Sequence, residues 1–224
     1  MPEPAAATPR ALRRPVERRG ARSGSILPKH PQGLDGTLRR IVCLILFPRT
    51  EFRQIAGESP SVDRLIRHFI LPLSLLAPAA TVIGMKSFDA AWDPLHGYTV
   101  PADQIFAAGA TTLFASLGSV FVLAAIFVVI APMYGSRTHY PTALAAAAYG
   151  AVPVQLAGLA LIVPSMIIVS MVALCHTLYL YYVAAQELLD VPDGAGTEFV
   201  GISMVFLVIL SIVLGAAASA TGVI

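Results

Sequence analysis

The chain has 224 residues, of which 56% are hydrophobic and only 12% carry a charge. Soluble domains have about 25% charged residues, and a mean hydropathy of +0.74 is far too high for one. The composition therefore excludes an ordinary soluble enzyme or a nucleic-acid-binding domain and indicates a membrane protein.

Residues 1–36 are rich in Pro, Ala, Gly and Arg and contain few large apolar side chains. Such a segment cannot bury enough apolar surface to fold, so we predict a disordered basic tail. Its six arginines between Arg10 and Arg22 would attract anionic lipid at about 1 kcal/mol each. The alternative is that the tail only sets the orientation of the protein. No apolar stretch follows this basic run closely, so no signal peptide is expected.

Residues 37–64 contain an apolar run from Ile41 to Phe47. It is far shorter than the roughly 20 residues that span a bilayer. Because Arg39 and Arg40 precede it and Pro48 ends it, we predict a cytosolic interfacial helix, with its arginines at headgroup level, followed by a linker.

Residues 65–222 are predicted to form the transmembrane domain of the protein. At 1.5 Å per residue each of its apolar segments can cross the bilayer as a helix. The expected fold is therefore an all-α, polytopic membrane helix bundle of five transmembrane helices, at about 65–85, 105–132, 142–163, 165–185 and 199–222.

The basic residues predict the orientation of these spans. Thirteen of the fifteen precede or open the first span, which places the N-terminus in the cytoplasm. Arg137, between the second and third spans, agrees with this orientation, and five spans leave the C-terminus outside. Tyr179 and Tyr182 then fall where an interfacial aromatic belt is expected.

The third span is interrupted by Gly150, Pro153 and Gly158. Pro153 lacks a backbone donor, so the carbonyl of Tyr149 needs another partner in lipid. Gln155, a water or another helix would supply it. The small residues around the proline favour a kink inside a packed bundle, and the alternative is a broken helix around a ligand site.

Several stretches together resemble the Yip (Ypt/Rab-interacting protein) family over roughly residues 37–222. They are FPRTEFRQIAGESP, FILPLSLLAPAATVIG, APMYG, AAYGAVPVQLAGL and LYLYYV. The resemblance is to the bacterial branch, five-span inner-membrane proteins to which no reaction is attributed. It implies the fold and a multi-pass location in the cytoplasmic membrane. The eukaryotic branch is linked to Rab GTPase binding through a long cytosolic N-terminal region, and this role is not expected of a short basic tail.

The resemblance also marks the residues that we expect to carry family motifs or to shape the helices. They are Pro48, Glu51, Ile55, Glu58, Pro72, Pro132, Gly135, Tyr149, Pro153, Gly158, Tyr179 and Tyr182.

The sequence shows little sign of chemistry. No charged residue lies in the middle of any span, although ion-coupled transporters normally carry one. His176 lies in the middle of the fourth span, and we expect a neutral histidine that is hydrogen-bonded across the bundle. The alternative is a metal ligand or proton carrier. We expect no catalytic residue, no metal and no cofactor.

The predicted function is that of a non-enzymatic scaffold or adaptor, or of a membrane-organising protein. The alternative is a transporter or channel for a neutral or amphipathic solute through the proline-interrupted bundle. The expected partners are the lipid bilayer, anionic lipid at the N-terminal arginines, an unidentified membrane protein and, through the small residues of Gly215–Gly222, a second copy of the chain. No nucleic acid is expected.

Overall fold

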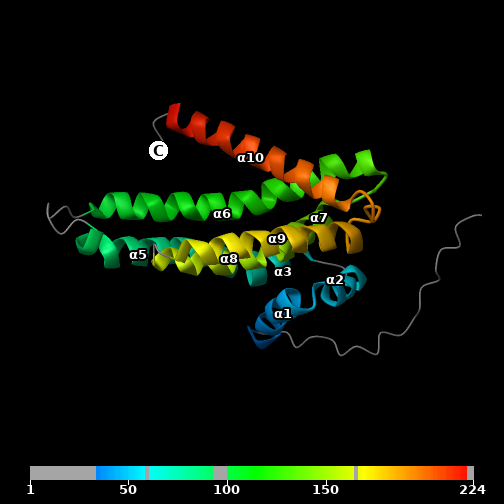
Figure 1. Ribbon diagram of the computed structural model, residues 1–224, viewed down its shortest axis with the longest axis horizontal. Helices are drawn as coiled ribbons and strands as arrows, with labels where there is room; N and C mark the ends of the chain where they lie inside the picture. Colours follow the sequence, from blue (N-terminus) through cyan, green and yellow to red (C-terminus); the bar gives the residue numbers. More distant parts are fainter. Residues whose placement is uncertain (1–33, 59–60, 93–99, 164–165, 221–224) are drawn as a thin grey trace, which may run out of the picture. The chain divides into compact units, whose positions relative to one another are not determined.

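The structure, a computed structural model, describes residues 34–58, 61–92, 100–163 and 166–220. Its described elements are all helical (Figure 1). They are α1 (Leu34–Leu46), α2 (Pro48–Gly57), α3 (Val62–Leu65), η1 (Ile66–Ile70), α4 (Leu71–Ser74), α5 (Leu76–Trp92), α6 (Ala102–Ile130), η2 (Ala131–Tyr134), α7 (Tyr140–Gly150), α8 (Val152–Ala157), η3 (Gly158–Ile162), α9 (Ile167–Glu187) and α10 (Gly196–Ala220).

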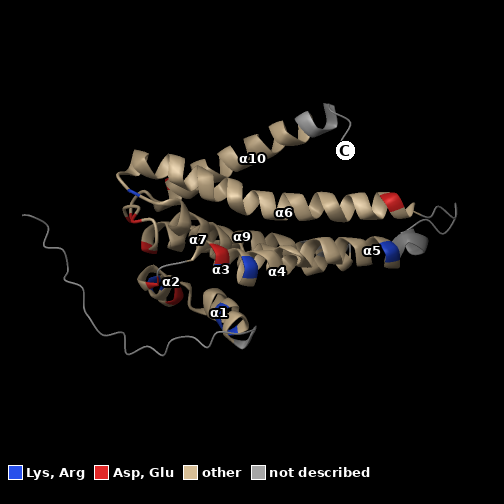
Figure 2. Cartoon of the chain, turned by 180° about the vertical axis from the view of Figure 1, so that it is seen from behind, with Lys and Arg blue, Asp and Glu red and all other residues tan. Residues whose placement is uncertain are grey.

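Four described stretches are long and apolar enough to cross a membrane: Val62–Ser87, Ala102–Tyr134, Ile168–Glu187 and Gly196–Ala216. A fifth span results if the pair Tyr140–Gly150 and Val152–Ala160, which bends by 43°, crosses as one unit. This arrangement confirms the predicted polytopic helical bundle. In Figure 2 the charged residues lie at the ends of the spans and on the N-terminal helices, and the long middle stretches carry none.

The spans pack in an order that differs from their order in the chain. α6 lies between α5 and α7, α9 contacts α7 and α8, and α10 packs against both α6 and α9. At one end, α2 lies against α9, and Ser136 of the α6–α7 loop donates a hydrogen bond to the carbonyl of Leu189, just beyond α9. We call this the α2 end of the bundle.

Helix α7 is the innermost helix of the described bundle. From Ala143 to Ala147 every side chain is fully buried. Small side chains let neighbouring helices approach closely, which is how apolar helices gain contact energy in lipid. Gly158 shows the same principle, because a Cβ there would lie 2.7 Å from the Cβ of Ala77 on α5.

Several boundaries differ from the predicted ones. The apolar run around Ile41–Phe47 is part of a longer helix that begins at Leu34. Pro48 then opens a second helix, α2, where a linker was expected; proline suits the first turn of a helix because no backbone donor is needed there. Residues Ile66–Ile70 form a π-helical turn, as the missing donor of Pro72 would favour.

Candidate functional site

Helix α2 carries a charge on its buried face. Pro48, Glu51, Phe52 and Ile55 share one face of the helix, and all four are buried. Glu51 is only 5% exposed. A carboxylate removed from water needs a cationic or hydrogen-bonding partner, since the desolvation cost is otherwise several kcal/mol.

Arg40 of α1 provides the cation. Its Nε lies 3.2 Å from Glu51 Oε1, and its Nη2 donates to both carboxylate oxygens of Glu58, at 2.7 and 3.0 Å. Its Nη1 donates to the hydroxyl of Tyr149 at 3.1 Å. We call Arg40, Glu51, Glu58 and Tyr149 the Arg40 cluster. It joins α1, α2 and the residue that follows α2 to α7 of the membrane bundle.

Tyr149 is held in place from both sides. Its ring meets the ring of Phe69 edge to face, with the centroids 4.5 Å apart. The guanidinium carbon of Arg40 lies 5.6 Å from the Tyr149 centroid, within the range of a cation–π contact. The tyrosine therefore serves Arg40 both as a hydrogen-bond acceptor and as an aromatic surface.

The charge of Arg40 is secured by this environment. Burial by itself lowers the pKa of the guanidinium, but the hydrogen bonds and charges of Glu58 and Tyr149 outweigh that effect, and the pKa of Arg40 lies above its ordinary value. The planar fork of arginine binds two acceptor groups at once, which a lysine ammonium does not do with the same geometry.

A second, exposed ion pair links α2 to α9. Arg53 Nε lies 2.9 Å from Glu187 Oε2, and the Arg53 side chain is 68% exposed. Hydrogen bonding to Glu187 raises the pKa of Arg53. An exposed pair of this kind contributes little to stability, but it orients α2 over the end of α9.

A polar network crosses the bundle near the bend in the third span. Gln155 Nε2 donates to Ser74 Oγ at 3.4 Å, and the hydroxyl of Ser116 donates to Gln155 Oε1 at 2.9 Å. The network thus joins the helices of three different spans. The Gln155 side chain was one suggested partner for the backbone freed by Pro153, but it serves these two serines instead.

Another helix pairs a different backbone group at the bend from the Tyr149 carbonyl. The N–H of Val154 donates to Thr177 Oγ1 of α9 at 3.1 Å. In lipid an unpaired backbone group costs several kcal/mol, so the bend needs such a partner. The structure therefore shows the predicted interruption at Pro153 as a bend between α7 and α8 that α9 supports from the side.

The expectation for His176 was wrong. Its Nε2 is buried and has no hydrogen-bond partner among the described residues, although its ring lies next to that of Tyr179, with the centroids 6.0 Å apart. No group of three His, Cys, Asp or Glu side chains that could hold a metal ion occurs in the described part of the chain.

The structure brings together only part of the predicted set of motif residues. Glu51, Glu58 and Tyr149 meet at Arg40, and Pro48 and Ile55 lie on the same buried face of α2 as Glu51. Elsewhere, Pro132 lies in the first turn of the short η2 helix that follows α6, and Gly135 comes after η2 with a φ of 75°, a left-handed conformation that favours glycine.

The two predicted belt tyrosines lie apart from the Arg40 cluster, on α9. Tyr182 accepts a hydrogen bond from Gln186 Nε2 at 2.9 Å. Both Tyr179 and Tyr182 line a groove between α9 and α10.

Two stretches were predicted to bind anionic lipid or a second copy of the chain. The arginines Arg10–Arg22 lie outside the described residues, and the stretch Gly215–Gly222 extends beyond the end of α10 at Ala220.

Arg40 is the central residue that sequence reasoning missed. Arg39 is exposed as expected, but the Arg40 side chain is only 14% exposed and points to acidic residues rather than to headgroups. The signal was available in the i, i+3, i+4, i+7 spacing of Pro48, Glu51, Phe52 and Ile55. A carboxylate on such a face requires a basic partner.

The Yip1 domain profile matches residues 42–215 of the chain, which run from α1 to α10. The chain belongs to the Yip family. With its apolar helices, this makes it a multi-pass integral membrane protein of Yip type. No curated protein and no solved structure matches the sequence.

Proposed function

We propose that this Yip-family protein is a non-enzymatic scaffold of the bacterial inner membrane. In this proposal the bundle holds α1 and α2 at the cytosolic surface, where α2 binds a protein partner. The observation that carries the proposal is the Arg40 cluster, because it ties α1 and α2 to each other through three charged groups and, through Tyr149, to α7 of the membrane domain, in addition to the apolar packing of both helices. We call α1 and α2 together the platform.

The two helices of the platform expose different chemistry. α1 buries Ile41 and Leu44 against the bundle, and on another side it exposes apolar side chains that include Leu38, Val42 and Leu46, each more than half exposed. This i, i+4, i+8 face suits the acyl region just below the headgroups. α2 exposes polar residues that include Arg49, Thr50 and Arg53. The exposed face of α2 is thus the part of the platform that suits a partner in water.

The proposed orientation of the protein in the membrane follows from the positions of its basic residues. The platform and the loop with Arg137 lie at the same end of the bundle, and basic residues near the membrane mark the cytosolic side. The platform is therefore proposed to face the cytosol, with the C-terminus on the opposite side of the membrane.

Site-specific photocrosslinking in cells tests the scaffold proposal. A crosslinker at Thr50, on the exposed face of α2, is expected to capture a defined protein, and a crosslinker at Phe206 on α10 is not. Arg40→Gln should abolish the Thr50 product at unchanged membrane levels of the protein, whereas Arg39→Gln should leave it. Capture of lipid alone, or products that Arg40→Gln does not change, would contradict the proposal.

Transport of a neutral or amphipathic solute is the second candidate. It is favoured by a groove of about 480 Å³ between α1, α8 and α9, which is lined by Pro153 and by His176 with its unpaired nitrogen. Flux of a panel of neutral solutes into proteoliposomes tests it. Pro153→Ala should change the flux if the bend forms the path, and a flux equal to that of empty liposomes for every solute would exclude this function for the panel.

A further inference from the structure

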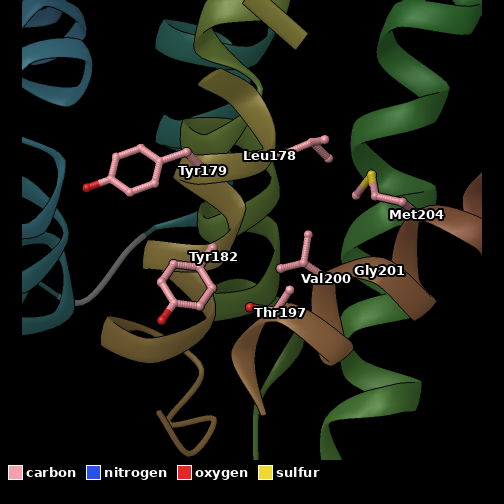
Figure 3. Close-up of a pocket in the computed structure, with 7 residues that line it drawn as sticks. All are labelled: Leu178, Tyr179, Tyr182, Thr197, Val200, Gly201 and Met204. Carbon is pink, nitrogen blue, oxygen red and sulfur yellow. The ribbon is translucent and has the colours of Figure 1, made fainter. Parts of the chain in front are cut away.

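A second groove lies between α9 and α10, remote in sequence from the platform. It has a volume of about 430 Å³ and is lined by residues of these two helices only. Figure 3 shows Leu178 of α9 and Met204 of α10 pointing toward each other across it. Both helices belong to membrane spans and expose many apolar side chains, so the groove opens toward lipid.

The polarity of the groove changes along its length. Tyr182 and Thr197 lie together at the end near the α9–α10 loop (Figure 3). Met204 lies seven residues beyond Thr197, which is about 10 Å deeper along the helix. The polar end therefore faces the headgroup region and the apolar end faces the acyl chains, as the two ends of a lipid molecule would require.

The chain segment beside the polar end of the groove is acidic. The segment from Asp190 to Glu198 carries three carboxylates and no basic residue. Asp193 belongs to the groove mouth, because Gln186 Nε2 donates both to its carbonyl oxygen, at 3.4 Å, and to the Tyr182 hydroxyl. Carboxylates at this position favour a headgroup with a positive end and oppose one with a net negative charge.

The volume of the groove, about 430 Å³, lies in the usual range of about 300–1,000 Å³ for a small-molecule site. Because the groove opens toward lipid, a single acyl chain can lie in it with its headgroup at the mouth.

We propose that the α9–α10 groove binds a zwitterionic aminophospholipid of the phosphatidylethanolamine type. One acyl chain lies along Leu178, Val200 and Met204, and the ammonium group lies beside the carboxylates of the α9–α10 loop. The Thr197 hydroxyl, at the mouth of the groove, is placed to bond the phosphate or ester oxygens. This inference goes beyond the proposed function and does not depend on it, since the platform uses neither α10 nor the groove.

Native mass spectrometry of the full-length protein in detergent tests the proposal. The protein is titrated with phosphatidylethanolamine, phosphatidylcholine and phosphatidylglycerol of identical acyl chains. We expect phosphatidylethanolamine to bind best, phosphatidylcholine more weakly because its ammonium cannot donate a hydrogen bond, and phosphatidylglycerol least. Equal binding of all three lipids, or preferred binding of phosphatidylglycerol, would overturn the proposed headgroup.

A matched pair of substitutions tests the place of binding. Gly201 lines the groove, and a Cβ there meets no atom within 4 Å, so the side chain of Gly201→Leu starts from open space and takes up room in the groove. It should weaken phosphatidylethanolamine binding at least about tenfold, or about 1.4 kcal/mol. Gly118→Leu is the control, because Gly118 of α6 also has open space and does not line the groove. Equal effects of the two variants would overturn the site.

A second variant keeps the test decisive if Gly201→Leu folds poorly. The hydrogen bond from Gln186 is accepted by the backbone oxygen of Asp193, so Asp193→Asn preserves it while removing one charge. It should weaken phosphatidylethanolamine binding more than phosphatidylcholine binding, because only the primary ammonium also donates a hydrogen bond to the carboxylate, and so reduce the preference between the two lipids. An unchanged preference would contradict the proposed role of the carboxylates.

Discussion

Arg40 shows how one side chain can join parts of the chain that are far apart in sequence. Its three groups of partners belong to α2, to the residue after α2 and to α7, 109 residues away from Arg40 in the case of Tyr149. Each partner uses a different nitrogen of the guanidinium. The buried Glu51 depends most on this arrangement, because a carboxylate that is 5% exposed loses nearly all of its hydration.

The first prediction concerns Arg40 itself. Arg40→Gln leaves Glu51 buried without its guanidinium and should destabilise docking of the platform by about 3 kcal/mol. Hydrogen exchange of the α2 amides in detergent measures this loss. Adding Glu51→Gln should recover part of it, since the buried charge that Arg40 compensates is then removed. Arg39→Gln, at an exposed neighbouring position, is the control and should change exchange little; equal effects at the two positions would contradict the role of the cluster.

The second prediction concerns the packing of Gly158. A Cβ at this position would lie 2.7 Å from the Cβ of Ala77 and 3.1 Å from its Cα, and backbone cannot easily move aside. Gly158→Ala should therefore lower stability by about 1–3 kcal/mol, measured by thermal unfolding in detergent. Gly118→Ala, where the Cβ meets open space, should be neutral or slightly stabilising. A neutral Gly158→Ala would show that η3 does not pack this closely on α5.

At the scale of elements, the third span is the irregular part of the bundle. The chain bends by 43° between α7 and α8, and Pro153 lies in the first turn of α8. The bend is tolerated because neighbouring helices provide polar partners: Thr177 accepts the Val154 N–H, and Gln155 reaches Ser74 and Ser116. These interactions fix the bend from two sides.

The third prediction tests the contact that supports this bend. Thr177→Val keeps the shape of the side chain but removes the acceptor for the Val154 N–H. We expect a loss of about 1 kcal/mol, in the range measured for side-chain hydrogen bonds inside membranes, again by thermal unfolding. Ser211→Ala is the control, because the Ser211 hydroxyl bonds only the Leu207 carbonyl of its own helix. A loss no greater than that of Ser211→Ala would contradict the support from α9.

At the scale of the whole molecule, the positions of the charged residues and the packing of the helices both distinguish the two ends of the bundle. The α2 end carries the platform, the loop with Arg137 and the acidic loop between α9 and α10. The long middle stretches of the spans carry no charged residue, so the bundle meets lipid with apolar surface. In the proposed orientation the platform lies on one face of the membrane only.

The fourth prediction follows from this division. Topology reporters fused at Arg137 and after Ile224 should report opposite compartments, with Arg137 in the cytosol, because an odd number of crossings separates them if α7 and α8 cross as one span. A reporter at Leu34 should agree with Arg137. Reports of the same compartment from Arg137 and Ile224 would mean that the bent pair enters and leaves on one side.

Much of the architecture was readable from the sequence. Long uncharged segments predict spanning helices because lipid allows few other backbone structures, and four described stretches, or five if the bent pair counts as one, are long and apolar enough to cross a membrane. Small differences arise at the ends. α10 begins at Gly196 rather than near residue 199, since polar residues are tolerated where a helix leaves the bilayer.

The lengths of the apolar segments and the positions of the charged residues by themselves determined a helical membrane bundle with a basic N-terminal region, because both are local properties of a chain. Only the tertiary structure decided which polar groups meet. Glu51 and Glu58 could be named as motif residues, but their pairing with Arg40 and Tyr149 depends on how α1, α2 and α7 pack. The same packing turned the bond expected of His176 into an unpaired nitrogen, because the partner of a side chain is set by its neighbours in space.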